Sequence, residues 1–210
     1  MTTPKHPQLG LIDYGSGNLR SVTKALESVL SVIHRVSQGP IPDGIDALVL
    51  PGVGSFGDSV SQLQQRELFD PIRAWLEAGK PFFGICLGYQ LLFERSEESP
   101  DVRGLGVLPG EVRRFASPNI KIPQIGWNTV GWSTQALKRY PDLPADPYVY
   151  FVHSYYPVPA DSTLVAGITD YGGTFASAVA QENLFATQFH PEKSQAAGLQ
   201  ILKTFVASLP

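Results

Sequence analysis

Up to about residue 100, short apolar runs alternate with stretches whose apolar residues recur at helical spacing. Strands are predicted by the apolar runs at 8–13, 32–36, 47–50 and 81–85. Helices are predicted at 19–30, from 58 towards 79, and at 87–94. Asn18 is the expected N-cap of the first helix, and Pro71 is expected to interrupt the second. This alternation predicts an α/β fold with a doubly wound, mostly parallel sheet.

After about residue 100 the pattern changes to short β-rich runs separated by turn residues. These runs lie at 104–108, 111–115, 148–152, 163–168, 175–180 and 184–189. They predict antiparallel additions to the sheet in the C-terminal half. Residues 195–209 return to helical spacing. Because we find no repeat, low-complexity tract or linker, we expect one domain over residues 1–210.

Composition narrows the class of protein. The 210 residues are 43% hydrophobic and 17% charged, an ordinary globular balance. A net charge of −3 indicates no basic surface for nucleic acid or an anionic membrane. No apolar run approaches the roughly 18 residues of a membrane span, and the N-terminus MTTPKHPQ has no apolar signal segment. We therefore expect a cytoplasmic protein with neither a nucleic-acid nor a membrane partner.

Three glycine-containing stretches follow predicted strands, where open α/β sheets bind their ligands. They are GSGN at 15–18, PGVGSFG at 51–57 and GICLG at 84–88. GSGN lacks the third glycine of a dinucleotide fingerprint because Arg20 stands there, and a tight turn explains the stretch equally well. No GKS or GKT occurs, which excludes a P-loop.

GICLG places Cys86, the only cysteine, between two glycines at a strand-to-helix junction. This arrangement repeats the nucleophile elbow, in which small flanking residues permit a sharp, strained turn. The N-terminus of the following helix would favour a thiolate. A single cysteine forms no internal disulfide and no zinc cluster, and it is often simply a small buried hydrophobe. Cys86 therefore needs a base before it can be assigned as a nucleophile.

His190 is the best candidate for that base. Pro191 biases His190 towards an extended backbone, in which residues i and i+2 point the same way. Glu192 can then reach the imidazole, fix its tautomer and stabilise the imidazolium, as the third member of a triad does. The alternative is a polar loop with Glu192 near a helix N-cap.

The other three histidines are weaker candidates. His6 lies in a predicted tail and His34 in or beside a strand. His153 is either a packed strand residue or a residue that lines the site. PGVGSFG completes the candidate site, because its glycines let the backbone approach a ligand and its amides can point at an oxyanion. Taken alone, this stretch would be interpreted as a plain loop.

The stretches FGICLGYQLLFE, PGVGSFGD and QFHPEKS resemble the signatures of class I, triad-type glutamine amidotransferases. IDYGSGNL, GWN at 126–128 and YFVHSYY at 150–156 narrow the resemblance to the glutaminase subunits of imidazole glycerol phosphate synthases. It covers nearly the whole chain, from Leu11 to about Phe205, and implies the fold of that class. One departure is Gln124, where many relatives have histidine; it affects only the surface around Trp127.

The resemblance implies hydrolysis of glutamine to glutamate and ammonia without a cofactor or metal. Cys86 would attack the side-chain amide, His190 would move the protons, and Glu192 would orient His190. The oxyanion hole is then expected from the amides of Gly52, Val53 and Leu87. Residues expected to position glutamine are Gln90, Ser154 and Tyr155.

The resemblance also implies a partner, a (βα)₈ cyclase subunit that forms a heterodimer with the glutaminase and receives its ammonia. The cyclase uses this ammonia to make imidazole glycerol phosphate and aminoimidazole carboxamide ribotide in histidine biosynthesis. Residues expected at the interface are Trp127, Asn128 and Lys193. For Trp127 the competing interpretation is a core tryptophan.

Three alternatives remain at this point. The chain could be a glutaminase that serves another acceptor synthase, in anthranilate or pyridoxal phosphate synthesis. It could be a cysteine hydrolase of the intracellular peptidase-like families, although these usually lack the His-Pro-Glu pairing. It could be an inert interaction subunit, against which the complete set of Cys86, His190 and Glu192 argues.

Overall fold

The computed structural model describes residues 6–15, 17–29 and 31–210. In this part of the chain the central sheet has eight strands in the order β2–β1–β3–β4–β13–β12–β11–β8. Their bounds are β1 Gln8–Ile12, β2 Val32–Val36, β3 Ala47–Gly52, β4 Phe82–Cys86, β8 Gly131–Trp132, β11 Val165–Asp170, β12 Thr174–Gln181 and β13 Leu184–Thr187. The first five strands in that order run parallel, and β12, β11 and β8 add antiparallel pairs. The predicted doubly wound, mostly parallel sheet is confirmed.

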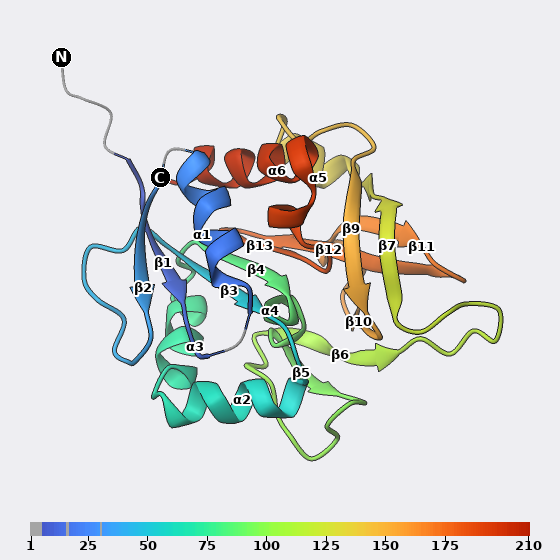
Figure 1. The fold of residues 1–210 in the computed structure, drawn as a ribbon, viewed down its shortest axis with the longest axis horizontal. Coiled ribbons are helices and arrows are strands. Elements are labelled where there is room, and N and C mark those ends of the chain that lie inside the picture. Colours follow the sequence, from blue (N-terminus) through green and yellow to red (C-terminus); the bar gives the residue numbers. More distant parts are fainter. Residues whose placement is uncertain (1–5, 16, 30) are drawn as a thin grey trace.

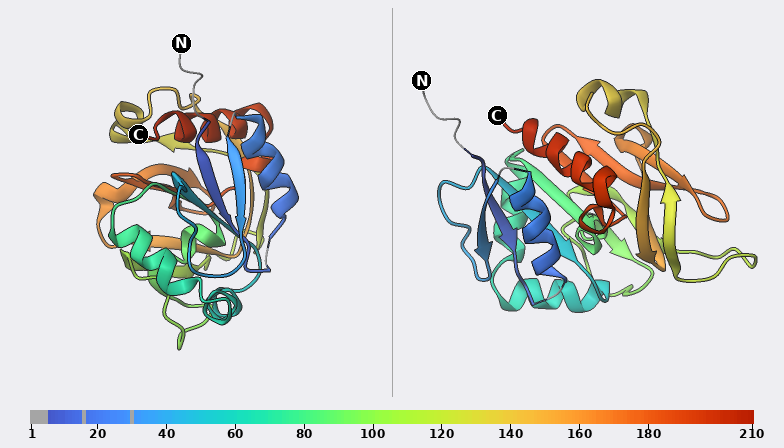
Figure 2. Two further views of the ribbon diagram at one scale, coloured as in Figure 1. Left: turned by 90° about the vertical axis from the view of Figure 1, so that its left-hand side faces the viewer. Right: turned by 45° about the horizontal axis from the view of Figure 1, so that its top comes forward.

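Helices cover both faces of this sheet (Figures 1 and 2). On one face lie α1 (Leu19–Ser28) and α6 (Gln195–Ala207), and on the other α2 (Phe56–Gln65) and α3 (Phe69–Glu77). Each face has its own apolar cluster, because the buried strands present apolar residues in both directions. Packing on both faces holds the strands of the sheet in place, and with them the carboxyl ends that carry the candidate site.

Strand β13 was predicted among the antiparallel additions. Its pairing with β12 is antiparallel, but the strand runs in the same direction as the parallel strands of the N-terminal half, which the prediction missed. It pairs parallel with β4, with Thr187 opposite Ile85. All four of its residues are buried, and a continuous apolar run is typical of a parallel strand covered on both faces. This insertion brings the segment after β13 beside Cys86 at the end of β4.

Two smaller sheets flank the central one. One has the order β10–β6–β5, and the other pairs β7 with β9 antiparallel. Their bounds are β5 Phe93–Ser96, β6 Leu108–Arg114, β7 Gln124–Thr129, β9 Tyr148–His153 and β10 Tyr155–Pro159. The sequence pattern did not predict β5, β7, β8, β10 or the short helix α5 (Thr134–Arg139). In β7 burial alternates from residue to residue, since one face of the β7–β9 ribbon is open.

Two helix predictions need correction. The helix after β3 starts at Phe56, capped by Ser55, and the break before α3 lies at 66–68, where Glu67 has φ 54°. Pro71 is instead in the first turn of α3, where a missing N–H costs nothing. The helix after β4, α4, spans only Leu87–Gln90, because β5 begins at Phe93.

Other features of the first helix match expectation. The Asn18 side chain accepts a hydrogen bond from the Ser21 amide, as an N-cap does. Leu30, at the predicted end of this helix, and Ser16 of GSGN lie outside the described residues.

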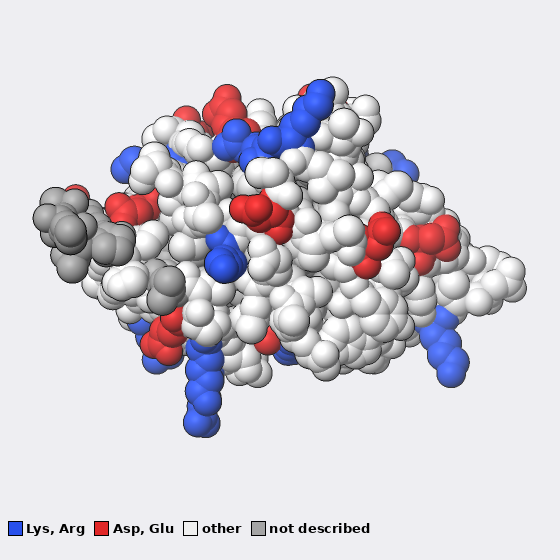
Figure 3. Space-filling model, turned by 90° about the horizontal axis from the view of Figure 1, so that it is seen from above, with Lys and Arg blue, Asp and Glu red and all other residues white. Residues whose placement is uncertain are grey.

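On the face drawn in Figure 3, basic and acidic side chains are interspersed. None of the described helices has the length and apolar character to cross a membrane.

Candidate active site

Cys86 ends β4 in a strained backbone conformation, with φ 54° and ψ −106°. Such a φ is unusual for a residue other than glycine and is found where the surrounding structure imposes it. A Cβ at Gly88 would lie 1.9 Å from the Leu50 carbonyl oxygen, and one at Gly84 would lie 3.1 Å from the Ala186 Cβ. The two glycines therefore permit the sharp elbow that the sequence predicted. Since α4 has only one turn, its dipole contributes less at Cys86 than a full helix would.

His190 faces this elbow from the segment after β13. Its amide donates to the Tyr150 carbonyl at 2.9 Å, which ties it to β9. The ring Nδ1 lies 2.8 Å from Glu192 Oε1, and both side chains are almost fully buried. The expected contact is present, but Glu192 reaches the ring through a 3₁₀ turn at Pro191–Lys193 and not through an extended segment. Because a carboxylate only accepts, Nδ1 carries the hydrogen and Nε2 is left for Cys86.

The charges around His190 favour its protonated form. Burial of the ring lowers the pKa of His190, whereas the negative charge of Cys86, its hydrogen bond and the Glu192 carboxylate raise it, and the balance raises this pKa to about 10. Among the described residues, His190 Nε2 and Glu192 Oε2 are the buried side-chain polar atoms without an aligned partner. An unfilled hydrogen-bonding position beside a thiol is what a proton-transferring ring needs.

The glycine-rich loop lies next to the thiol because Gly52 and Cys86 are partners in the β3–β4 register. A Cβ at Gly52 would lie 2.5 Å from Tyr14 Oη and 2.9 Å from the Leu87 Cβ. Close approach, and not a positive φ, therefore requires glycine at this position. Gly54, two residues on, does have a positive φ of 107°. Val53 is 40% exposed and borders the cavity above Cys86.

A cavity of about 380 Å³ opens beside Cys86, within the size range of small-molecule sites. It brings together most of the predicted site residues, namely Val53, Cys86, Leu87, Gln90, Ser154, Tyr155 and Lys193. Gly54 of PGVGSFG and His153 also line it, and so do three residues that the sequence did not indicate, namely Glu98, Pro123 and Val152. A larger cavity of about 660 Å³ borders α5, and its lining includes no cysteine or histidine. The chemistry therefore points to the smaller cavity.

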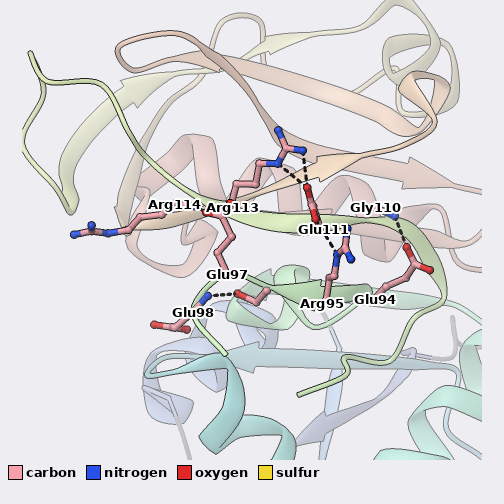
Figure 4. Close-up of polar contacts among 9 residues, drawn as sticks. Glu94, Arg95, Glu97, Glu98, Gly110, Glu111, Arg113 and Arg114 are labelled. Atoms are coloured by element: carbon pink, nitrogen blue, oxygen red, sulfur yellow. Dashed lines mark hydrogen bonds and ion pairs between the residues drawn. The ribbon is translucent and has the colours of Figure 1, made fainter. Parts of the chain in front are cut away.

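Glu98 places a carboxylate at this cavity. The segment that carries it follows β5, which an ion-pair network holds to β6: Glu111 accepts from both Arg95 and Arg113 (Figure 4). Glu98 Oε2 accepts from the Phe56 amide at 2.7 Å, at the start of α2. No spacing in the sequence links Glu98 to Cys86, so only the fold reveals that both residues line the same cavity.

His153 is both a packed strand residue and a wall of the cavity, so the two interpretations left open for it hold together. Burial lowers the pKa of His153 to about 4, so the ring is neutral at pH 7. Its Nδ1 lies 2.8 Å from the Tyr155 carbonyl, to which it must donate. Its Nε2 lies 3.1 Å from Gln124 Oε1. Because the Nε2 of a ring that donates from Nδ1 can only accept, we assign the amide of Gln124 with its nitrogen turned towards Nε2. Gln124 is 3% exposed, so it affects the interior beneath the β7–β9 ribbon and not the surface.

The outer face of this ribbon is aromatic and exposed. Trp127 is 37% exposed and stacks on Tyr148 at a centroid distance of 5.8 Å, so it does not lie in the core. Lys193 Nζ lies 5.9 Å from the Tyr150 ring centroid. Asn128 donates from its side chain to the Asp170 carbonyl at 2.8 Å. We call the surface formed by Ile125, Trp127, Tyr148 and Tyr150 the aromatic face.

The described residues contain no cluster of three or more His, Cys, Asp or Glu side chains that could hold a metal ion. The arrangement around Cys86 instead supports nucleophilic attack by sulfur, with an imidazole within reach and a carboxylate behind it.

Known proteins have the same fold, and others are similar to this chain in sequence. The family model for class-I glutamine amidotransferases matches residues 10–209, so the chain belongs to this enzyme family. A crystal structure of a glutamine amidotransferase superposes with a TM-score of 0.74 at 20% identity, covering 95% of this chain and 97% of that one. The structure of PurLQS from Thermotoga maritima gives a TM-score of 0.75 at 20% identity, with 97% of each chain covered. These two structures establish the shared fold.

Sequence relatives narrow the family. The imidazole glycerol phosphate synthase subunit HisH of Microcystis aeruginosa is 48% identical over 201 residues, which is 94% of each chain. The HisH subunit of Thermosynechococcus vestitus is 49% identical over 204 residues, covering 96% of this chain and 97% of that one. Within the class, the chain thus belongs with the HisH subunits of imidazole glycerol phosphate synthase, as its motifs indicated.

Proposed function

We propose that this chain hydrolyses glutamine to glutamate and ammonia with Cys86 as nucleophile, His190 as acid and base, and Glu192 as the group that orients His190. The observation that carries this proposal is the buried His190–Glu192 pair, 2.8 Å apart, beside a thiol on a strained elbow. A purely structural cysteine needs neither the elbow nor a buried imidazole beside it.

The first half-reaction uses His190 as an acid. The raised pKa keeps its ring protonated at neutral pH beside the Cys86 thiolate. The thiolate attacks the side-chain amide carbon of glutamine, and the tetrahedral oxyanion is held by the amides of Leu87 and the Gly52–Val53 segment. His190 then gives its proton to the leaving nitrogen, ammonia departs and a thioester remains on Cys86.

The second half-reaction uses the same ring as a base. In the thioester the sulfur carries no charge, so the largest influence that raises the pKa of His190 is gone. The neutral ring removes a proton from water, which attacks the thioester and releases glutamate and the thiolate. Glu192 holds the ring in one tautomer throughout, and proton and charge return to their starting places.

The cavity offers groups that suit a free amino acid. Gln90, Ser154 and Tyr155 surround the space above Cys86, as expected for positioning glutamine. The Glu98 carboxylate at the same cavity suits the α-ammonium group, which a peptide substrate would lack. This favours glutamine over the peptide substrates of a cysteine peptidase.

We further infer that the ammonia passes to a (βα)₈ cyclase subunit, which makes imidazole glycerol phosphate and aminoimidazole carboxamide ribotide in histidine biosynthesis. The relatives named as imidazole glycerol phosphate synthase subunits favour this acceptor over anthranilate or pyridoxal phosphate synthesis. The aromatic face, with Trp127, Asn128 and Lys193 on or beside it, is the proposed docking surface. Exposed aromatic side chains of this kind are frequent hot spots of interfaces.

Glutamate release tests this function. It is measured on the purified chain alone, with a candidate cyclase, and with the cyclase plus its nucleotide ligand. We propose that the peptide between Gly52 and Val53 can turn either its amide or its carbonyl towards the oxyanion, and that the cyclase with its ligand favours the amide orientation. Since one oxyanion donor is worth about 10²–10³ in kcat, we expect release to rise by about two orders of magnitude in the full mixture. Equal release with and without the cyclase would contradict the coupling, and no release under any condition would contradict the activity.

A further inference from the structure

Gln188 is a fully buried amide that lies against the nucleophile. It follows β13 directly, and the register that places Thr187 opposite Ile85 places the next residue beside Cys86. Its side-chain Nε2 is 3.6 Å from Cys86 Sγ, and the residue is 0% exposed. Gln188 also stands two residues before His190, so one short segment brings two nitrogens to the same sulfur.

The direction of this amide is imposed by a backbone carbonyl. Tyr155 O accepts from Gln90 Nε2 at 2.9 Å, and a carbonyl cannot donate, so the amide nitrogen of Gln90 must point there. The same Nε2 donates to Gln188 Oε1 at 3.1 Å. With its oxygen committed to Gln90, Gln188 has only its N–H groups to offer Cys86.

We propose that Gln188 is a further residue of the nucleophilic site, a fixed hydrogen-bond donor that stabilises the Cys86 thiolate. Gln90 acts through it as a positioning residue. This proposal deepens the proposed function and rests on it. The donor serves both half-reactions, because the thiolate is the attacking group in the first and the leaving group in the second. Stabilising the thiolate raises its population more than it lowers its nucleophilicity, since nucleophilicity changes with an exponent of only about 0.4–0.5.

Alkylation of the thiol tests this role without needing glutamine turnover. Cys86 is the only cysteine, so incorporation of iodoacetamide into the complete chain reports on it alone. Gln188→Met keeps the length of the side chain and removes the donor. Loss of one hydrogen bond to a charged group should lower the thiolate population at pH 7 about tenfold, and the higher nucleophilicity of the remaining thiolate offsets about threefold of this. We therefore expect the alkylation rate at pH 7 to be about three- to fourfold lower, with the pH dependence of the rate shifted upward by about one unit. Gln65→Met, an exposed change on α2, is the matched control.

A second variant keeps the test decisive if the first fails to fold. Gln188→Asn retains an amide that is one methylene too short to reach the sulfur, so it should also slow alkylation. If Gln188 only fills space, Gln188→Met should behave like the unchanged chain and only Gln188→Asn should be impaired. Unchanged alkylation in folded Gln188→Met would overturn the proposal. A chain that shows the predicted alkylation profile but no glutamate release with the cyclase would instead contradict the proposed function.

Discussion

Gly52 and Cys86 lie directly opposite each other at the carboxyl ends of β3 and β4. Adjacent parallel strands thus carry the proposed oxyanion loop to the proposed nucleophile. A Cβ at Gly52 would meet the Leu87 Cβ at 2.9 Å as well as Tyr14 Oη at 2.5 Å. Because a Cβ cannot move without its backbone, a side chain at Gly52 must shift either the loop or the elbow. We expect Gly52→Ala to lower glutamate release in the complex by about 10²–10³, the cost of one lost oxyanion donor.

The matched control for this change is Gly131→Ala. A Cβ at Gly131 would lie 3.7 Å from Ile168 Cγ1, an ordinary contact, so activity should be unchanged. Full glutamate release by a folded Gly52→Ala variant would mean that the loop at Gly52 does not stabilise the oxyanion.

The members of the triad should contribute unequally. In the proposed mechanism His190 transfers protons in both half-reactions. His190→Ala should therefore reduce turnover as far as loss of Cys86 does, because such residues act as a unit. Glu192→Gln retains an oxygen that can accept from Nδ1 and removes only the charge. Turnover should therefore fall less in Glu192→Gln than in His190→Ala. Single-turnover rates of thioester formation and hydrolysis would separate these effects. A folded Glu192→Gln variant as inactive as His190→Ala would contradict this division of roles.

Buried His153 should make the fold sensitive to acid. Its pKa is about 4 in the folded chain and near 6.5 when unfolded, so the unfolded chain binds more protons between these values. Stability should therefore fall as the pH drops from 6.5 towards 4, by on the order of 3 kcal/mol from this group. Urea unfolding at several pH values gives the free energy of unfolding as a function of pH. This free energy should change less steeply with pH for His153→Gln, because its side chain cannot titrate. Identical slopes would mean that His153 does not remain neutral in the folded state.

Trp127 should matter for association more than for folding. Because it is 37% exposed, Trp127→Ala should weaken binding to the cyclase clearly and lower the melting temperature little. Trp75 provides the opposite control: it is 8% exposed and donates to the Pro81 carbonyl, so Trp75→Ala should destabilise the chain without touching the interface. Binding and melting curves measured on both variants decide this. A large thermal loss with unchanged binding for Trp127→Ala would refute the docking surface.

The sequence alone indicated the sheet and the nucleophilic elbow because both depend on local patterns. Apolar runs ending in glycines marked the strands that carry Gly52 and Cys86. The spacing of His190 and Glu192 predicted their contact, although a 3₁₀ turn and not the expected extended segment forms it. Glu98 could not be predicted, because its approach to the cavity depends on how β5 and β6 pair. Gln188 carried a usable signal, since it stands two residues before His190. Recognising its role still required β13 beside β4, which the pattern had placed among the antiparallel strands.

The central claim is that Cys86 releases the ammonia that the cyclase consumes. Its most direct test compares synthesis of imidazole glycerol phosphate by the complex of Cys86→Ser with the cyclase, using either glutamine or free ammonia as the nitrogen source. Synthesis from glutamine should be abolished while synthesis from ammonia is unchanged, because the cyclase needs only ammonia. Appreciable turnover of glutamine by the Cys86→Ser complex would contradict this claim.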